Sequence, residues 1–291
     1  MDAGDVFTGA LPRLQELKDD IIVIKVGGHA MIDPATRSSI IKDIVTLRYL
    51  GLKPVVVHGG GPEIDAMLQR MGKTSTFISG LRVTDDETME IVRMVLVGNV
   101  NTDIVTLISK HGGKGVGLLG NSGNLLVGKK KDPEKVMVDG KEAEVDYGWV
   151  GETIKINTGI VLTLLNDGYI PVISPVGYDQ QGKCLNLNAD TAAGDIAAAL
   201  KAKSLIALTD VNGVMMDPAR KETLISKLTI EESYDLIKRG IISKGMIPKI
   251  LSSITVLRAG IGSVHIINGN IPHALVLELL TEQGVGTSIT K

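Results

Sequence analysis

Two short stretches near the start of the chain place glycines directly after a run of β-branched residues. They read IIVIKVGG at 21–28 and VVVHGGGP at 55–62, and neither matches the GxxxxGK[ST] phosphate loop. A β-branched run predicts a buried strand, and glycines allow a sharp turn and a close approach of backbone N–H groups to a ligand. Pro62 is typical of a first helical turn, where free N–H groups and the helix dipole attract anions. Together the stretches predict a phosphate-binding edge of a parallel sheet with Lys25 beside it, whereas either one alone also fits an ordinary glycine turn.

Two charged residues occupy first helical turns in the second half of the chain. Lys249 follows Pro248 in a predicted helix, and the positive end of a helix dipole is unfavourable for a lysine unless an anion binds there. The alternative for Lys249 is a side chain bent into water. Asp190 lies in the polar stretch 186–194, which begins an alanine-rich helix. Its position fits either a helix cap or a group that holds lysines or magnesium beside a phosphate.

The composition argues against several classes of protein. The 291 residues carry a net charge of −2, and the isoelectric point is near 6.2, which argues against a nucleic-acid partner. A single cysteine, Cys184, excludes an internal disulfide and a cysteine zinc cluster. The N-terminus has no apolar signal core, and no uninterrupted apolar run reaches the ~18 residues of a membrane span. We therefore expect a cytoplasmic protein without a membrane or nucleic-acid partner.

The elements that position these residues begin with an amphipathic helix. Residues 5–18 repeat apolar side chains at helical spacing, with Pro12 expected to interrupt the middle. A second helix is expected over 38–50, which completes a right-handed βαβ unit between the two glycine strands. Thr84 and Glu87 have the spacing of a capping box before a long helical region.

The pattern changes to short β runs over 115–149. Turn residues at 121–124 and 139–140 predict a hairpin flap over the first half of the fold, with the lysines of 129–131 at its solvated tip. A GxGxxG pattern occurs at 115–120, but a strand-like run follows it in place of a helix. A dinucleotide site is therefore rejected.

Alternating strands and helices continue to the end of the chain. Helices are expected over 157–166 and 189–200, and strands over 169–174 and 204–209. This alternation predicts an α/β fold with helices on both faces of a parallel sheet.

Several segments together resemble the amino-acid kinase family over nearly the whole chain. They include VIKVGGHAM, VVVHGGGPEID, SGLRVTDDETMEIVRMVLVGNVN, LNLNADTAAGDIA, LTDVNG, KGMIPKI and VHIINGNIPHALVLELLTEQGVGTSI. The resemblance implies a three-layer α/β/α sandwich with a central, mainly parallel eight-stranded sheet. It also implies an N-terminal oligomerisation helix at 1–20, a lobe at 21–180 that binds an acetylated amino acid and forms dimers, and an ATP-binding lobe at 181–291.

Carried over by motif, the resemblance implies a role for each polar residue above. Lys25 and Lys249 would stabilise the transferring γ-phosphoryl group, and Asp190 would orient both lysines. The residues implied to bind the acceptor substrate are Gly28, Gly59, Gly60, Arg82 and Asn186. The residues implied to bind ATP, with Mg²⁺ carried by the nucleotide, are Gly27, Thr209, Asp210, Gly213 and Lys249. This set suits phosphoryl transfer, which depends on positioning and charge neutralisation.

The reaction implied by the resemblance is the ATP-dependent phosphorylation of the γ-carboxylate of N-acetyl-L-glutamate, the second step of arginine biosynthesis. A kinase for an amino-blocked aminoadipate of lysine biosynthesis is an alternative, because one methylene is worth only about 1–3 kcal/mol in a pocket. A non-catalytic sensor of arginine or nucleotide is a second alternative, although a pure sensor has no need of both lysines and Asp190. The sequence departs from the family pattern at His29 and at 120–123, which leaves the fine specificity open.

The two ends of the chain resemble family members that arginine inhibits. Those proteins carry a comparable N-terminal helix, which interlaces with its copy on a neighbouring dimer and builds a hexameric ring. His265 and Glu278 match family positions that contact arginine, and Gly284 lies in the turn after a helix expected over 272–281. The resemblance therefore implies a homo-oligomer, a trimer of dimers, with arginine as an allosteric inhibitor.

Overall fold

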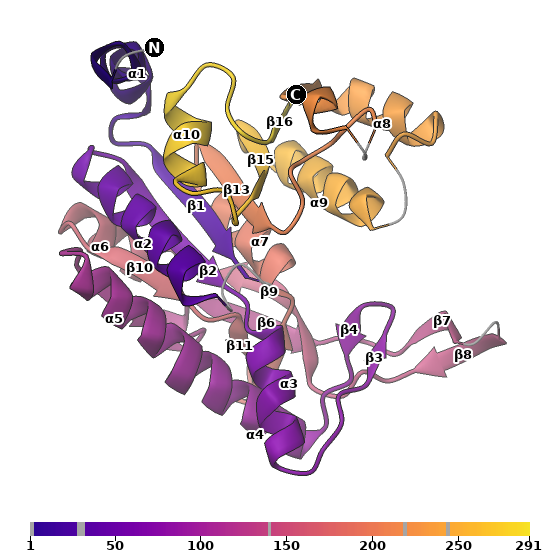
Figure 1. Cartoon of the computed structure of the whole chain (residues 1–291). Coiled ribbons are helices and arrows are strands. Elements are labelled where there is room, and N and C mark those ends of the chain that lie inside the picture. Colours follow the sequence, from indigo (N-terminus) through magenta and orange to yellow (C-terminus); the bar gives the residue numbers. More distant parts are fainter. Residues whose placement is uncertain (1–2, 28–32, 139–140, 218–219, 243–244) are drawn as a thin grey trace.

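An eight-stranded sheet forms the middle of the molecule. The computed structural model describes residues 3–27, 33–138, 141–217, 220–242 and 245–291. The strands follow the order β14-β16-β15-β13-β1-β2-β10-β5 (Figure 1), and all neighbours are parallel except β15 and β16. Their bounds are β1 (Ile21–Val26), β2 (Lys53–His58), β5 (Gly115–Leu118), β10 (Ile170–Ile173), β13 (Ser204–Thr209), β14 (Lys227–Thr229), β15 (Ser263–Asn268) and β16 (Thr287–Thr290).

The strands of this sheet alternate their side chains between two hydrophobic cores. On β1, Ile22 and Ile24 face one core and Val23 faces the other. The helical segments that contribute to the first core are α1 (Ala3–Leu17), α2 (Pro34–Tyr49), α3 (Gly61–Arg70), α4 (Asp86–Arg93), η2 (Met94–Asn101), α5 (Thr102–Lys110) and α10 (Ala274–Leu280). The helices that contribute to the second core are α6 (Gly159–Asn166), α7 (Ala189–Leu200), α8 (Ile230–Lys238) and α9 (Met246–Arg258). The expected three-layer α/β/α sandwich is confirmed.

Strand β1 joins the two halves of the chain within one sheet. It pairs with β2 on one side and with β13 on the other. In this sheet the strands from before residue 180 lie on the β2 side, and those from after it lie on the β13 side. Ligands of α/β proteins bind beyond the carboxyl ends of the strands at such a reversal of strand order. The glycine turns after β1 and β2 lie at this edge, and the proposed division into lobes at residue 180 stays a prediction.

A second, smaller β structure carries most of the region between β5 and α7. Four strands close into a barrel, namely β6 (Leu126–Lys130), β9 (Val150–Ile156), β11 (Val176–Tyr178) and β12 (Cys184–Leu187). A short 3₁₀ turn, η3 (Ser122–Asn124), and then β6 follow β5, so the expected absence of a helix after the GxGxxG pattern is confirmed. Another 3₁₀ turn, η4 (Lys221–Thr223), precedes β14.

The chain also forms two hairpins outside the central sheet and the barrel. The short one pairs β3 (Phe77–Ile78) with β4 (Leu81–Arg82), and the long one pairs β7 (Glu134–Val138) with β8 (Lys141–Val145). The predicted turn at 139–140 lies outside the described residues. The long hairpin points away from the body of the molecule (Figure 1), so the expectation of a flap over the fold is wrong. The lysines of 129–131 are not at its tip, because Lys129 and Lys130 belong to β6 and pair with β9.

Three expected helix features differ in the structure. Helix α1 (Ala3–Leu17) continues through Pro12, which removes one backbone donor without ending the helix. Helix α2 begins at Pro34 and not at 38, because Asp33 caps it. The predicted capping box is also wrong, since Thr84 is buried in a β-bridge to Gly148 and Asp85 caps α4.

The helical stretch Asp86–Lys110 combines α4, a π-helical segment η2 (Met94–Asn101) and α5. By length and composition alone its 25 residues could cross a membrane. However, 44% of its most apolar window is buried inside the protein, and Val95, Leu96 and Val100 belong to the first core. The stretch therefore packs as a core helix, and its π-helical turns are of a kind that often marks functional sites.

Candidate active site

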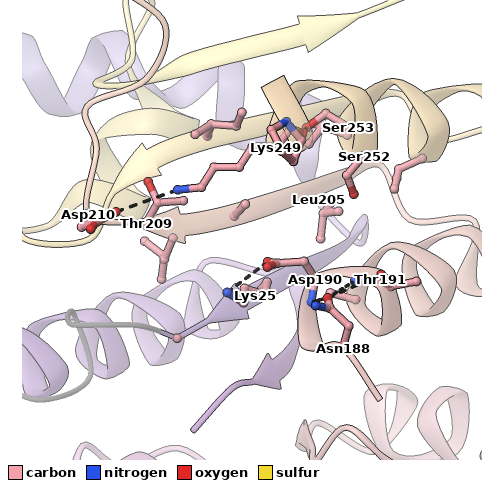
Figure 2. A pocket seen from close by; sticks show the side chains of 18 residues that line it. Lys25, Asn188, Asp190, Thr191, Leu205, Thr209, Asp210, Lys249, Ser252 and Ser253 are labelled. Carbon is pink, nitrogen blue, oxygen red and sulfur yellow. Dashed lines mark hydrogen bonds and ion pairs between the residues drawn. The ribbon is translucent and has the colours of Figure 1, made fainter. Parts of the chain in front are cut away.

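Two cavities open at the carboxyl ends of the central strands. The first has a volume of about 350 Å³ and is lined by residues of β1, β13, α7 and α9 (Figure 2). The second has a volume of about 300 Å³ and is lined by residues of α3, β4 and β12 and by the glycine turn after β2. Lys25, Asn188 and Asp190 line both cavities. Two small ligands would therefore meet at Lys25 and Asp190.

Lys25 is held by a carboxylate from α7. Its Nζ lies 3.0 Å from Asp190 Oδ1, and the lysine side chain is only 14% exposed. Asn188 Oδ1 accepts the N–H of Asp190 at 2.9 Å and the N–H of Thr191 at 3.0 Å, so Asn188 is the cap of α7. Because the cap is provided elsewhere, the Asp190 carboxylate serves Lys25 and not the helix end.

Lys249 enters the first cavity from the opposite wall. It lies in the first turn of α9, and Figure 2 shows its side chain extending toward Asp210. Its Nζ is 3.9 Å from Asp210 Oδ1, and its side chain is 40% exposed. Among the described residues the structure pairs Asp190 with Lys25 and Asp210 with Lys249. The expected contact of Asp190 with both lysines is thus present for Lys25 alone.

Most of the predicted nucleotide residues line the first cavity. Gly27, Thr209 and Asp210 do so at the ends of β1 and β13. A Cβ atom at Gly27 would lie 3.1 Å from Lys25 Nζ, so a side chain there would crowd the ion pair. Gly213 is not among the residues lining either cavity. It packs on Thr287 of β16, and its φ of +124° favours glycine.

In the second glycine stretch, Gly59 and Gly60 differ in whether their backbone N–H is free for a ligand. Gly59 and Gly60 both line it. The Gly59 N–H donates to Val26 O at 2.8 Å, so in this geometry it is not free for a ligand. Gly60 is the N-cap of α3, and no acceptor within the described part of the chain takes its N–H. Gly28, and with it His29, lies outside the described residues.

Arg82 and Asn186 line the second cavity as predicted. The Arg82 side chain is 5% exposed, and its Nη1 lies 2.5 Å from Asp65 Oδ1. Ser75 accepts from Arg82 and donates to Asp65. Burial alone would raise the pKa of Asp65, but the hydrogen bonds from Arg82 and Ser75 hold the pKa below its ordinary value. The guanidinium is therefore fixed in one orientation beside the cavity, and Asn186 donates to Thr84 Oγ1 at 3.1 Å.

Sequence reasoning missed Asn188 and Asp65 as supporting residues. An asparagine immediately before an alanine-rich helix is a typical N-cap signal, so Asn188 could have been found. Asp65 carries no such signal, because its partner Arg82 is 17 positions away and the fold alone brings the two together.

The chain matches known proteins along most of its length. Residues 20–268 match the model of the Amino acid kinase family. The chain belongs to this family. A protein of Methanocella arvoryzae named acetylglutamate kinase is 72% identical over 280 residues, which cover 96% of this chain and 93% of the relative. A protein of the same name from Methanocaldococcus jannaschii is 53% identical over 291 residues, 100% of this chain and 97% of the relative.

A solved structure also resembles this amino acid kinase. It is an N-acetylglutamate synthase from Neisseria gonorrhoeae complexed with coenzyme A and N-acetyl-glutamate, with a TM-score of 0.85 and 27% identity. The similarity covers 100% of this chain but only 64% of the synthase, so the chain spans about two thirds of that protein's length.

A third cavity of this amino acid kinase is lined by two of the three predicted arginine positions, His265 and Glu278. Its volume is about 320 Å³, and α1, β15 and α10 contribute to its lining. His265 Nδ1 lies 2.7 Å from Glu278 Oε1, and Glu278 Oε2 accepts the N–H groups of Val285 and Gly286 at 2.8 and 2.9 Å. Burial alone would raise the pKa of Glu278, but these hydrogen bonds keep the pKa below its ordinary value. A Cβ atom at Gly284 would lie 2.5 Å from Glu278 Oε2, so all three predicted residues lie together.

Proposed function

We propose that this amino acid kinase transfers the γ-phosphoryl group of ATP to the γ-carboxylate of N-acetyl-L-glutamate. The observation that carries the proposal is the meeting of two cavities at Lys25 and Asp190. One cavity offers Lys249 to a nucleotide, and the other offers Arg82 to a carboxylate substrate. Phosphoryl transfer requires donor and acceptor on opposite sides of the transferring group. The names of the relatives at 72% and 53% identity support the same substrate.

In the proposed reaction a γ-carboxylate oxygen of N-acetyl-L-glutamate attacks the γ-phosphorus of ATP. The bond between this phosphorus and the β,γ-bridging oxygen breaks, and ADP leaves with the electron pair. The product is the acyl phosphate N-acetyl-L-glutamyl 5-phosphate. A carboxylate is ionised at neutral pH, so the reaction requires no general base. The protein contributes positioning and neutralisation of charge.

The residues divide these tasks between them. Lys25 and Lys249 supply positive charge from opposite walls of the first cavity, and the Gly60 N–H adds a backbone donor from the second. Mg²⁺ enters as part of the nucleotide substrate. Asp190 and Asp210 are the carboxylates that line the first cavity, and they fit the one or two carboxylates that Mg²⁺ uses beside substrate phosphates.

An assay of ADP release with two substrates side by side tests the proposal. We expect turnover with N-acetyl-L-glutamate and a kcat/KM at least about 10-fold lower with N-acetyl-L-aminoadipate, because one methylene is worth about 1–3 kcal/mol. A higher kcat/KM with N-acetyl-L-aminoadipate would instead assign the enzyme to lysine biosynthesis. ADP release with neither substrate would overturn the kinase proposal.

We further propose that L-arginine binds in the third cavity and inhibits the enzyme. The buried Glu278 carboxylate offers an acceptor to a cationic ligand, and Arg13 and Lys203 line the same cavity and offer positive charge to a ligand carboxylate. Helix α1 supplies one wall through Arg13, Glu16 and Leu17. Part of α1 packs on its own subunit, since Leu17 is in the first core, but Leu11 stays 42% exposed. The proposed assembly is a hexamer of three dimers in which α1 also contacts a neighbouring copy.

Two forms of the protein test this regulation. We expect the full chain to form hexamers by light scattering, and we expect arginine to raise the KM for N-acetyl-L-glutamate with a sigmoidal dependence. A chain beginning at Asp19 should lose both properties and keep its turnover, because it lacks α1. A full chain that forms only dimers and ignores millimolar arginine would contradict the regulatory proposal and leave the kinase proposal intact.

A further inference from the structure

A buried polar cluster lies directly behind the glycine edge of the second cavity. His58 is the last residue of β2, and its side chain is fully buried. Its Nδ1 lies 2.8 Å from Gly59 O, and its Nε2 lies 3.0 Å from Ser174 Oγ and 3.2 Å from Asn101 Nδ2. The cluster thus connects β2, the end of η2 and the residue after β10, and the proposed reaction assigns it no role.

The hydrogen-bond partners determine which nitrogen of His58 carries the proton. A carbonyl oxygen only accepts, so Nδ1 must donate to Gly59 O. Nε2 of the neutral ring then accepts, and its two neighbouring donors are the Ser174 hydroxyl and the Asn101 amide. Asn101 Nδ2 also lies 2.9 Å from Val172 O and 3.0 Å from Ser174 Oγ, and the Ser174 hydroxyl has a second acceptor in Leu96 O at 3.4 Å. With either donor, Nδ1 donates and Nε2 accepts, so the cluster selects one tautomer of His58.

A charged His58, with a proton on both ring nitrogens, would be incompatible with these hydrogen bonds. A proton on Nε2 would place an N–H against the Asn101 amide, which is also a donor in this arrangement. Burial disfavours the charged ring as well and lowers the pKa of His58 to about 4. The ring is therefore neutral at physiological pH, with its proton on Nδ1.

The Gly59 carbonyl and the Gly60 N–H belong to one peptide unit. In a trans peptide these two groups point in opposite directions, and this peptide is trans. His58 binds the carbonyl on the side of the core, so the Gly60 N–H is directed to the other side, where Gly60 lines the second cavity. We propose that His58 is a positioning residue that holds the Gly59–Gly60 peptide with its N–H toward the transferring phosphoryl group. This inference rests on the proposed phosphoryl transfer.

The π-helical segment η2 packs closely around the same peptide. A Cβ atom at Gly60 would lie 2.5 Å from Leu96 Cδ2. Leu96 and Asn101 both come from η2, so the widened helical turns bring an apolar contact to Gly60 and a hydrogen-bonding amide to His58.

Two matched substitutions separate positioning from packing. His58→Asn keeps an amide N–H near the place of Nδ1, whereas His58→Gln keeps the volume and puts its amide near the place of Nε2. We expect His58→Gln to lower kcat by about 10- to 100-fold, somewhat less than the 10²–10³ lost with a whole oxyanion donor. His58→Asn should recover at least about 10-fold of that loss, with the KM for ATP within about 3-fold of wild type in both variants. Packing alone predicts the reverse order, and an equal or higher kcat in His58→Gln would overturn the proposal.

A measurement on the unchanged protein tests the geometry if either variant fails to fold. In ¹⁵N-histidine NMR spectra we expect His58, assigned through its contacts with the Gly59 and Gly60 amides, to be a neutral Nδ1–H ring from pH 5.5 to 8. An Nε2–H ring, or titration above pH 6, would overturn the proposal. Wild-type turnover of N-acetyl-L-glutamate is measured first. Its absence would overturn the kinase proposal, whereas an active wild type with the wrong order of variants would overturn only the role of His58.

Discussion

The two lysines of the first cavity are held in different ways. Lys25 lies on a central strand, is nearly enclosed, and contacts a carboxylate at 3.0 Å whose own helix is capped by Asn188. Lys249 lies at a helix start, is 40% exposed, and has its carboxylate partner Asp210 at 3.9 Å. One wall of the site thus has a close, nearly enclosed ion pair, and the other has a longer contact from a more exposed lysine. Positioning of charge in the first cavity is therefore concentrated at β1.

The largest effect is expected at the enclosed lysine. Lys25→Ala should lower kcat by about 10³-fold, the upper part of the range for one well-placed donor to transition-state charge. The melting temperature should change little compared with Lys42→Ala, which removes an exposed lysine from α2. Steady-state kinetics and a thermal melt measure both quantities. Near-normal turnover in Lys25→Ala would show that this lysine takes no part in the reaction.

A smaller effect is expected at the exposed lysine. Lys249→Ala should lower kcat by about 10²-fold and also raise the KM for ATP, because a phosphate of the bound nucleotide would give this exposed side chain a closer partner than Asp210 at 3.9 Å. Lys249→Arg, which keeps the charge, should restore part of the rate. A larger loss of kcat in Lys249→Ala than in Lys25→Ala would contradict the conclusion that positioning is concentrated at β1.

A change at Arg82, in the second cavity, should affect the KM for the acceptor substrate. Lysine cannot reproduce the bidentate contact of a guanidinium with a carboxylate. Arg82→Lys should therefore raise the KM for N-acetyl-L-glutamate by about 10-fold, which corresponds to roughly 1.4 kcal/mol. The KM for ATP should stay nearly unchanged, and initial rates with each substrate varied in turn measure both. An equal rise in both constants would indicate a defect in folding or closure instead.

The smallest effect is expected at the cap that anchors the segment carrying Arg82. Asp85 accepts hydrogen bonds from Thr88 and is paired with Lys73, and these contacts lower the pKa of Asp85 to about 2. Asp85→Ala should lower the free energy of unfolding at pH 7 by about 0.5–1 kcal/mol, as for other exposed N-caps. A lowered pKa stabilises the fold above the ordinary value near 3.8, and this contribution is lost as the pH falls toward 2. Denaturant unfolding should show wild type and variant converging there, whereas a constant difference down to pH 2 would contradict this account.

The sequence predicted the central strands and the residues at their ends, because these depend on local patterns. The β-branched runs correspond to β1 and β2, and glycines that follow each of them line the cavities, Gly27 after β1 and Gly59 and Gly60 after β2. Asp190 and Lys25 also lie together as predicted. The resemblance to known proteins added the eight-stranded sheet and the ligands proposed for the two cavities.

Features that depend on contacts distant in sequence could not be predicted. Pro12 remains inside a helix that packs on the body through Ala10, Leu14 and Leu17. Thr84 has the spacing of a cap, yet a bridge to Gly148 buries it. The cluster around His58 joins residues separated by 43 and 116 positions, so local spacing in the sequence could not predict it.

The hydrogen bonds between β1 and β13 also give the molecule mechanical properties. They join the strands that carry Lys25 and Thr209, and they run from Ile22 to Lys25. Opening the site cannot occur as free rotation about a linker, since it must change the torsion of a hydrogen-bonded sheet whose neighbouring strands are normally twisted by roughly 20–25°. A misplacement of about 1 Å between reacting groups can cost about 10²-fold in rate. The sheet therefore resists opening elastically. A small change of its twist, far from the reacting atoms, is enough to misplace them and stop the reaction. The sheet returns to its resting twist when the force is removed.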